Sequence, residues 1–156
     1  MFRKLRRFKQ ELTEEECIGI LRKEPRGVMA VHGEDGYPYA FPLDFIYMEG
    51  KLFFHCAKEG HKLDAIAADP RVSFCVMNEG CRKEGDWALN ISSVILFGRI
   101  RKIEETEETL RIASQIAEKY YPTKEAAEEE VRKAGSRVQI LEMTIDHMTG
   151  KLVNES

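Results

Sequence analysis

Two short glycine turns constrain the first third of this 156-residue chain more than any other feature. Asp35-Gly36 follows the apolar stretch "RGVMAVHG", and Glu49-Gly50 follows "YPYAFPLDFIYM". Asp-Gly and similar pairs form tight turns that join neighbouring antiparallel strands. The segments 26–33, 37–48 and 51–57 are therefore predicted to form an antiparallel meander.

Three more strands and four helices are predicted downstream and around this meander. The strands are 71–78, 91–103 and 137–148, and the helices are 13–23, 61–68, 104–121 and 124–135. Thr13 with Glu16 three residues later is a capping-box signature. Gly98 inside the strand 91–103 indicates a β-bulge. Long strands joined by hairpins, with helices inserted late, predict a mainly β fold: a six-stranded antiparallel β-barrel, closed or nearly closed, with flanking helices. We expect residues 1–156 to form a single domain.

Composition excludes several function classes. Hydrophobic residues make up 43% and charged residues 33% of the chain, and the net charge of −3 gives no general case for nucleic-acid binding. No apolar run approaches the about 20 residues that cross a bilayer, and no apolar leader follows the basic start, so we expect a cytoplasmic protein. Residues 1–10 form a basic arm. A solvated arm is the simpler interpretation, and binding to nucleic acid or to an acidic membrane surface is the alternative.

The four cysteines give no clear metal signature. Cys17, Cys56, Cys75 and Cys81 form no CxxC pair. His55 and Cys56 are adjacent in a predicted strand, so their side chains point to opposite faces. Since the spacing matches no standard zinc module, we expect no bound metal and reduced cysteines.

The stretch "FFHCAKEGHKLDAI" is the most unusual part of the chain, because a strand there turns through Gly60 into a helix. The free N–H groups at a helix start and the positive end of the helix dipole attract anions. Lys58, His61 and Lys62 add positive charge where acidic residues are usual. This pattern predicts a phosphate cradle. The alternative is that both lysines are ordinary surface residues and that His61 is an incidental part of the helix start.

Several segments in their order resemble a known family. "GYPYAFPLDFIY", "LFFHCAKEGHKLDAI", "DPRVSFCV", "SSVILFGRIR" and "IDHMTGK" resemble the FMN-binding split-barrel superfamily of pyridoxamine 5′-phosphate oxidase, and more narrowly its nitroimidazole-resistance (Nim-type) branch. The resemblance runs from about residue 10 to 152. "YAFPLD" lacks the basic residues of the fuller oxidase, which argues against vitamin B6 oxidation.

The resemblance implies a split barrel that binds FMN at the subunit interface of a homodimer. In that family, basic residues on the turn after the strand hold the flavin phosphate, and here they fall on His61 and Lys62. The cradle and the resemblance together place these residues at the cofactor: Tyr39, Pro42, Leu43, His55, Cys56, Ala57, Lys58, Gly60, His61, Lys62 and Ser93.

Two functions follow as alternatives. The first is an FMN-dependent oxidoreductase that uses NAD(P)H to reduce a small organic molecule, with His55 as a catalytic proton donor because histidine titrates near neutral pH. The second is a flavin-binding or redox-sensing protein without turnover. His55 then only hydrogen-bonds the flavin or a backbone carbonyl.

Overall fold

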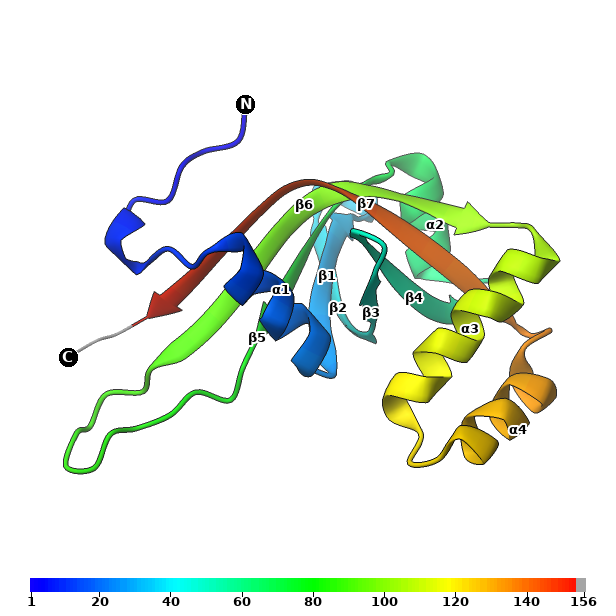
Figure 1. Cartoon of the computed structure of the whole chain (residues 1–156). Coiled ribbons are helices and arrows are strands. Elements are labelled where there is room, and N and C mark those ends of the chain that lie inside the picture. Colours follow the sequence, from blue (N-terminus) through cyan, green and yellow to red (C-terminus); the bar gives the residue numbers. More distant parts are fainter. Residues whose placement is uncertain (154–156) are drawn as a thin grey trace.

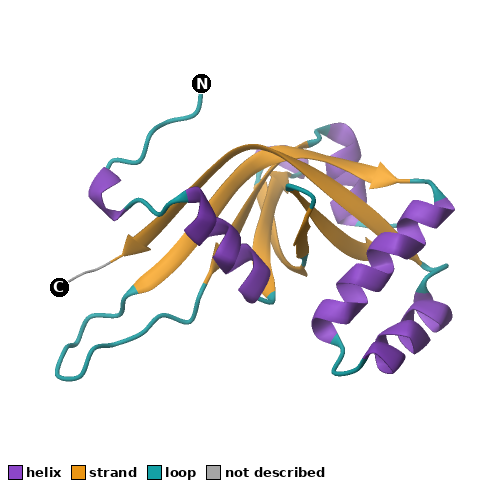
Figure 2. Ribbon diagram, in the orientation of Figure 1, coloured by secondary structure: helices purple, strands orange, loops and turns teal. Residues whose placement is uncertain are grey.

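The structure, a computed structural model, describes residues 1–153. Its strands form one antiparallel sheet in the order β2-β1-β5-β6-β7-β4-β3 (Figures 1 and 2). The strands are β1 (Arg26–His32), β2 (Pro38–Asp44), β3 (Ile46–Met48), β4 (Lys51–Ala57), β5 (Arg71–Met77), β6 (Ile91–Ile103) and β7 (Val138–Val153). The helices are α1 (Glu14–Lys23), α2 (His61–Ala68), α3 (Thr106–Tyr120) and α4 (Lys124–Ala134), with 3₁₀ turns η1 (Phe8–Gln10) and η2 (Glu34–Gly36). The predicted split barrel with flanking helices is confirmed, with seven strands in the sheet where six were predicted.

The extra strand arises because the predicted segment 37–48 breaks at Phe45. The Phe45 N–H donates a hydrogen bond to the Tyr120 hydroxyl oxygen (2.8 Å), and Lys119 Nζ donates to the Phe45 carbonyl (2.9 Å). Both partners lie at the end of α3, about 75 residues away in the chain. The backbone of Phe45 is thus satisfied by side chains of α3, and β2 and β3 end and begin on either side of it.

Both predicted glycine turns are confirmed. Asp35 and Gly36 have φ of 56° and 77°, and Glu49 and Gly50 have φ of 55° and 72°. Positive φ at both central residues is what a two-residue hairpin turn of type I′ requires. These turns set the registers that bring β2 back along β1 and β4 back along β3.

The predicted bulge at Gly98 is also confirmed, since the register between β6 and β7 shifts between Phe97 and Gly98. A Cβ on Gly98 would lie 2.1 Å from the Thr144 carbonyl oxygen, so only glycine fits this close approach. Figure 1 shows β6 and β7 arching together over the other strands, and a bulge is a usual cause of such a bend.

The sheet is buried on both faces at β4. Leu52 and Phe54 lie in the main core inside the barrel, which also holds Leu21 of the capping-box helix α1. Phe53 points the other way into a second cluster with Ile112 of α3. The helical hairpin α3–α4 therefore covers the outside of β4, and this covering builds one of the pockets described below. Within residues 1–153 no helix is both long enough and apolar enough to cross a membrane.

Candidate functional site

Helix α2 begins without a side-chain cap, directly after β4. Its N-cap residue is Gly60, with φ of 138° and no heavy atom within 4 Å of the place a Cβ would occupy. The side-chain acceptor that Ser, Thr, Asp or Asn would supply to the first N–H groups is thus missing. Free N–H groups, open space and the positive end of the helix dipole are the ingredients of an anion site.

A cavity of about 110 Å³ lies at this helix start, and we call it the cradle. Its lining is Tyr39, Cys56, Ala57, Glu59, Gly60, His61, Lys62 and Leu63. Six of the eleven residues predicted at the cofactor are therefore brought together from β2, β4 and α2. Glu59 and Leu63 also line the cradle and were not predicted from the sequence.

The basic side chains of the cradle are held by aromatic rings. The His61 ring stacks on Tyr39 with centroids 4.2 Å apart and planes 13° apart. Lys62 Nζ lies 5.1 Å from the centroid of Phe41, a cation–π distance. Burial raises the pKa of the Cys56 thiol, and the nearby positive charge of Lys62 partly opposes that rise. Lys62 is thus a restrained, half-buried cation beside the cavity.

His55 and Lys58 lie outside the cradle. His55 points to the opposite face of β4 from Cys56, as strand alternation predicts, and lines a separate cavity of about 280 Å³. This cavity, the helix pocket, is lined by Asp44, His55, Ala113, Ile116, Ala117, Tyr120, Tyr121, Glu130, Val131, Ala134, Gly135 and Val138. Lys58 lines a third cavity, with Glu104 and residues of α3.

The sequence analysis did not predict the helix pocket, because the pocket forms only where α3 and α4 pack against β4. The small residues Ala113 and Ala117, one turn apart on α3, were a usable signal, since small side chains leave room between packed helices. The pairing of those helices with β4 is a tertiary contact that no local pattern encodes.

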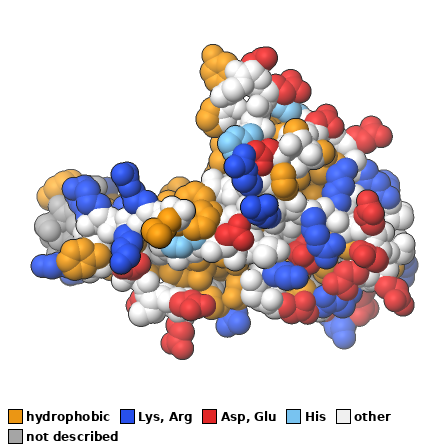
Figure 3. All heavy atoms as spheres, turned by 90° about the horizontal axis from the view of Figure 1, so that it is seen from above, with side chains coloured by type: hydrophobic (Ala, Val, Ile, Leu, Met, Phe, Trp, Pro, Cys, Tyr) orange, Lys and Arg blue, Asp and Glu red, His pale blue; other side chains and the backbone are white. Residues whose placement is uncertain are grey.

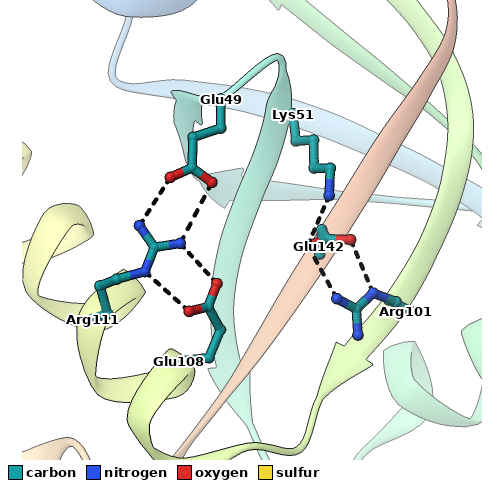
Figure 4. Close-up of polar contacts among 6 residues, drawn as sticks. All are labelled: Glu49, Lys51, Arg101, Glu108, Arg111 and Glu142. Carbon is teal, nitrogen blue, oxygen red and sulfur yellow. Dashed lines mark hydrogen bonds and ion pairs between the residues drawn. The ribbon is translucent and has the colours of Figure 1, made fainter.

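Salt bridges fix α3, one wall of the helix pocket, against the sheet (Figure 4). Arg111 of α3 bridges Glu49 in the β3–β4 turn (3.0 Å) and Glu108 (2.7 Å). Beside this group in Figure 4, the nearly buried Glu142 of β7 forms ion pairs with Arg101 (2.9 Å) and Lys51 (3.3 Å). Burial alone would raise the pKa of Glu142, but these two cations outweigh it and lower the pKa.

The end of α3 carries two half-buried polar side chains, of which Tyr120 lines the helix pocket and Lys119 does not. Burial lowers the pKa of Lys119 to about 8 and raises that of Tyr120 to about 12. Lys119 also donates to the Glu24 carbonyl (2.8 Å), and the Tyr120 hydroxyl lies 2.5 Å from the Pro25 carbonyl oxygen. Both side chains are therefore occupied in tying α3 to the loop after α1, and we assign them a structural role.

The predicted residues of β2 contribute in different ways. Pro42 is exposed and pairs with Val28 in an edge strand, where a residue without an N–H is tolerated. Leu43 is 7% exposed and its side chain packs in the main core, so it can offer a ligand only backbone groups.

Ser93 lies apart from the other predicted residues within one subunit. The register of the sheet aligns Ala40, next to Tyr39, with Phe97 of β6. Ser93 is four residues further along β6, which is roughly 13 Å at about 3.3 Å per residue. Its contact with a cofactor stays a prediction that needs a second subunit.

No group of His, Cys, Asp and Glu side chains suited to a metal ion occurs in the part of the chain that the structure describes. The four cysteines are free, and Cys17 is buried in the core.

The family assignment follows from a direct comparison. A family profile for pyridoxamine 5′-phosphate oxidase matches residues 13–152. The chain therefore belongs to the pyridoxamine 5′-phosphate oxidase family, and the family resemblance seen in the sequence is confirmed. Curated proteins give no match.

Solved structures with the same fold include three that are described in functional terms. A candidate 5-nitroimidazole antibiotic resistance protein from Bacteroides thetaiotaomicron is 19% identical, with a TM-score of 0.76 over 91% of this chain and 86% of its own. An FAD-binding protein from Mesorhizobium loti is 20% identical, with a TM-score of 0.67 over 93% and 98%. An FAD- and heme-binding protein from Mycobacterium smegmatis is 22% identical, with a TM-score of 0.75 over 95% and 74%. At these identities the likeness establishes the fold alone.

Proposed function

We propose that this chain binds FMN with the flavin phosphate in the cradle, and that it acts as an NAD(P)H-dependent reductase of a small organic molecule. The observation that carries the proposal is the uncapped start of α2, where Gly60, His61 and Lys62 surround a cavity beside the end of β4. Family membership supports it, as do the similar folds described as flavin-binding.

The size of the cradle supports binding of the phosphate group of the cofactor and not of the whole flavin. Its roughly 110 Å³ is well below the about 300–1,000 Å³ of pockets that enclose a whole small-molecule ligand. It suits a phosphate group, and the remainder of the flavin has to lie outside it. The barrel is open beside the cradle, since β3 pairs with β4 only over Lys51–Phe53 and leaves the edge from Phe54 to Ala57 free.

A second subunit would cover the rest of the flavin. Strand alternation puts Val28, Met77, Ile95 and Phe97 on one outer face of the sheet, where they are 40%, 55%, 41% and 38% exposed. Figure 3 looks down on the molecule and shows hydrophobic side chains exposed among charged ones. Contiguous exposed apolar faces are typical of interaction surfaces. We therefore propose a homodimer that buries this face and brings Ser93 toward the partner's cofactor.

The bound flavin would supply the redox chemistry, taking hydride from NAD(P)H and passing electrons to an acceptor. The chain itself would position the phosphate through Lys62 and His61 and exclude water at the subunit interface. His55 is exposed and lines the helix pocket, so it is free to give a proton to an acceptor bound there.

The test is a titration of flavin-free protein with FMN, FAD and riboflavin, followed by measurement of NADH and NADPH oxidation with a nitroaromatic or quinone acceptor. The proposal predicts that FMN binds much more tightly than riboflavin, which lacks the phosphate, and that the acceptor sustains turnover. Flavin binding without turnover would favour the carrier or redox sensor. No preference for FMN over riboflavin would contradict the cradle.

A further inference from the structure

The helix pocket, on the other face of β4 from the cradle, differs from the cradle in its charge. Its charged lining residues are Asp44 and Glu130, both acidic, and neither lysine nor arginine is among its lining residues. Asp44 is paired with Arg26 at 2.7 Å outside the pocket, so its charge is largely compensated. Glu130 has no salt-bridge partner among residues 1–153, and beside the burial of Tyr121 its negative charge helps to raise the pKa of that tyrosine.

The rest of the pocket is apolar and aromatic. Ala113, Ile116 and Ala117 come from α3, Val131 and Ala134 from α4, and two tyrosines complete the wall. A cavity of about 150 Å³ lined by apolar groups is known to hold a benzene ring, so about 280 Å³ has room for a substituted ring. Tyrosine faces attract cations as well as apolar groups.

We propose that the helix pocket binds the second substrate and selects a small aromatic molecule that is cationic or neutral, against phosphates and carboxylates. This inference rests on the proposed function, because the ligand is a substrate only if the chain is a reductase. His55 connects the two sites, since it lines the pocket and lies on β4, the strand that borders the cradle. An anion in the pocket meets Glu130, and no lysine or arginine among the lining residues compensates it. A cation is attracted to Glu130 as strongly as an anion is repelled by it.

The size of the selection follows from Coulomb's law. At an effective dielectric constant near 60, a unit charge on the ligand about 6 Å from a carboxylate changes the affinity of the ligand by a factor of about five. Reversing the charge of the ligand counts this factor twice, so we expect a cation to bind about 25-fold more tightly than an anion of the same shape, and a neutral ligand to fall between them.

The experiment uses three probes of equal shape: 4-nitrobenzylamine, which is cationic at neutral pH, the neutral 4-nitrobenzyl alcohol, and the anionic 4-nitrobenzoate. Their binding to the full chain is measured by calorimetry, and their KM values by NAD(P)H oxidation. We expect the order amine, alcohol, carboxylate, with about 25-fold between the ends. Equal binding of amine and carboxylate, or no binding by any probe, overturns the inference.

Two variants locate the effect. Glu130→Gln should bring the ratio of amine to carboxylate affinity close to one, whereas Glu128→Gln, on the same helix but outside the pocket, should keep the wild-type ratio. Ala134→Phe should fill the cavity and remove binding of all three probes, and Glu130→Gln remains the decisive variant if Ala134→Phe does not fold. A ratio unchanged in Glu130→Gln would overturn the assignment.

The titration of the same preparations with FMN separates the two proposals. If FMN binds but the three probes bind equally, only the substrate inference is contradicted. If the probes bind in the expected order but FMN does not bind, the flavin function is contradicted and the charge preference of the pocket is still supported.

Discussion

Replacing Lys62 by alanine removes the one cation that the structure holds, half-buried, at the cradle. Its Nζ is restrained 5.1 Å above the Phe41 ring, so little further ordering is needed to contact a phosphate. A hydrogen bond between charged groups contributes about 1.5–3 kcal/mol, and we therefore expect Lys62→Ala to weaken FMN binding by about tenfold to 150-fold. The side chain is not part of the core, so the melting temperature of the flavin-free protein should change little.

Lys58 provides a matched control on the same turn. It is exposed and lines the cavity that contains Glu104 instead of the cradle. Exposed charge pairs are worth about 0–1 kcal/mol, so Lys58→Ala should weaken FMN binding by about fivefold at most. The two variants lose the same charge from nearly the same place in the sequence, and only their position relative to the cradle differs.

The assay is an equilibrium titration of each flavin-free variant, followed by the change in flavin fluorescence at fixed ionic strength. Riboflavin serves as the second ligand, because it has the ring and the ribityl chain without the phosphate. The loss in Lys62→Ala should appear with FMN and be absent with riboflavin. Equal losses with both ligands, or equal effects of Lys58→Ala and Lys62→Ala, would show that the reasoning about the cradle is mistaken.

Four further predictions test other parts of the account. His55→Gln should keep FMN bound but slow the reaction with the acceptor by about 10²-fold and flatten its pH dependence; native rates across about pH 5.5 to 8, which brackets the ordinary histidine pKa, would make His55 structural. Tyr120→Phe leaves the Phe45 N–H without its acceptor and should lower the free energy of unfolding by about 1–3 kcal/mol in denaturant titrations. An unchanged free energy of unfolding would show that this hydrogen bond does not explain the strand break at Phe45. The pKa of Lys119 is lowered to about 8 in the folded protein, so above that pH the unfolded chain binds more protons than the folded one. The free energy of unfolding of the wild type should therefore rise between about pH 8 and 9.5, and this rise should be absent in Lys119→Met. Ile95→Glu puts a charge on the exposed sheet face and should convert a dimer to monomers in light scattering, and an unchanged mass would place the interface elsewhere.

The parts of the fold that the sequence predicted are those set by local chemistry. The turns at Asp35-Gly36 and Glu49-Gly50 need positive φ, and the Thr13 capping box closes with hydrogen bonds of 2.8 and 3.2 Å. Gly98 could be recognised because a glycine inside a strand often marks a bulge, although the contact that requires it is with Thr144 of β7. The break at Phe45 could not be predicted, because it depends on hydrogen bonds to two side chains at the end of α3.

The same distinction holds for the site. Most of the residues that line the cradle lie at one strand-to-helix junction, and the pattern around Gly60 and Lys62 indicated that junction. Tyr39 joins them from β2, and phosphate binding there stays a prediction. The helix pocket joins His55 to helices that follow about 50 residues later, so the neighbours of His55 were visible only in the folded chain. Whether Ser93 reaches a cofactor depends on how two subunits assemble, which neither the sequence pattern nor one subunit determines.

The most direct test of the central claim is native mass spectrometry of the purified protein after incubation with excess FMN and removal of unbound flavin. The account predicts a dimer that carries two FMN molecules, one for each cradle, and loss of the flavin mass in Lys62→Ala at FMN concentrations that saturate the wild type. A protein that takes up no FMN under these conditions, or that retains it equally in Lys62→Ala, would contradict the account.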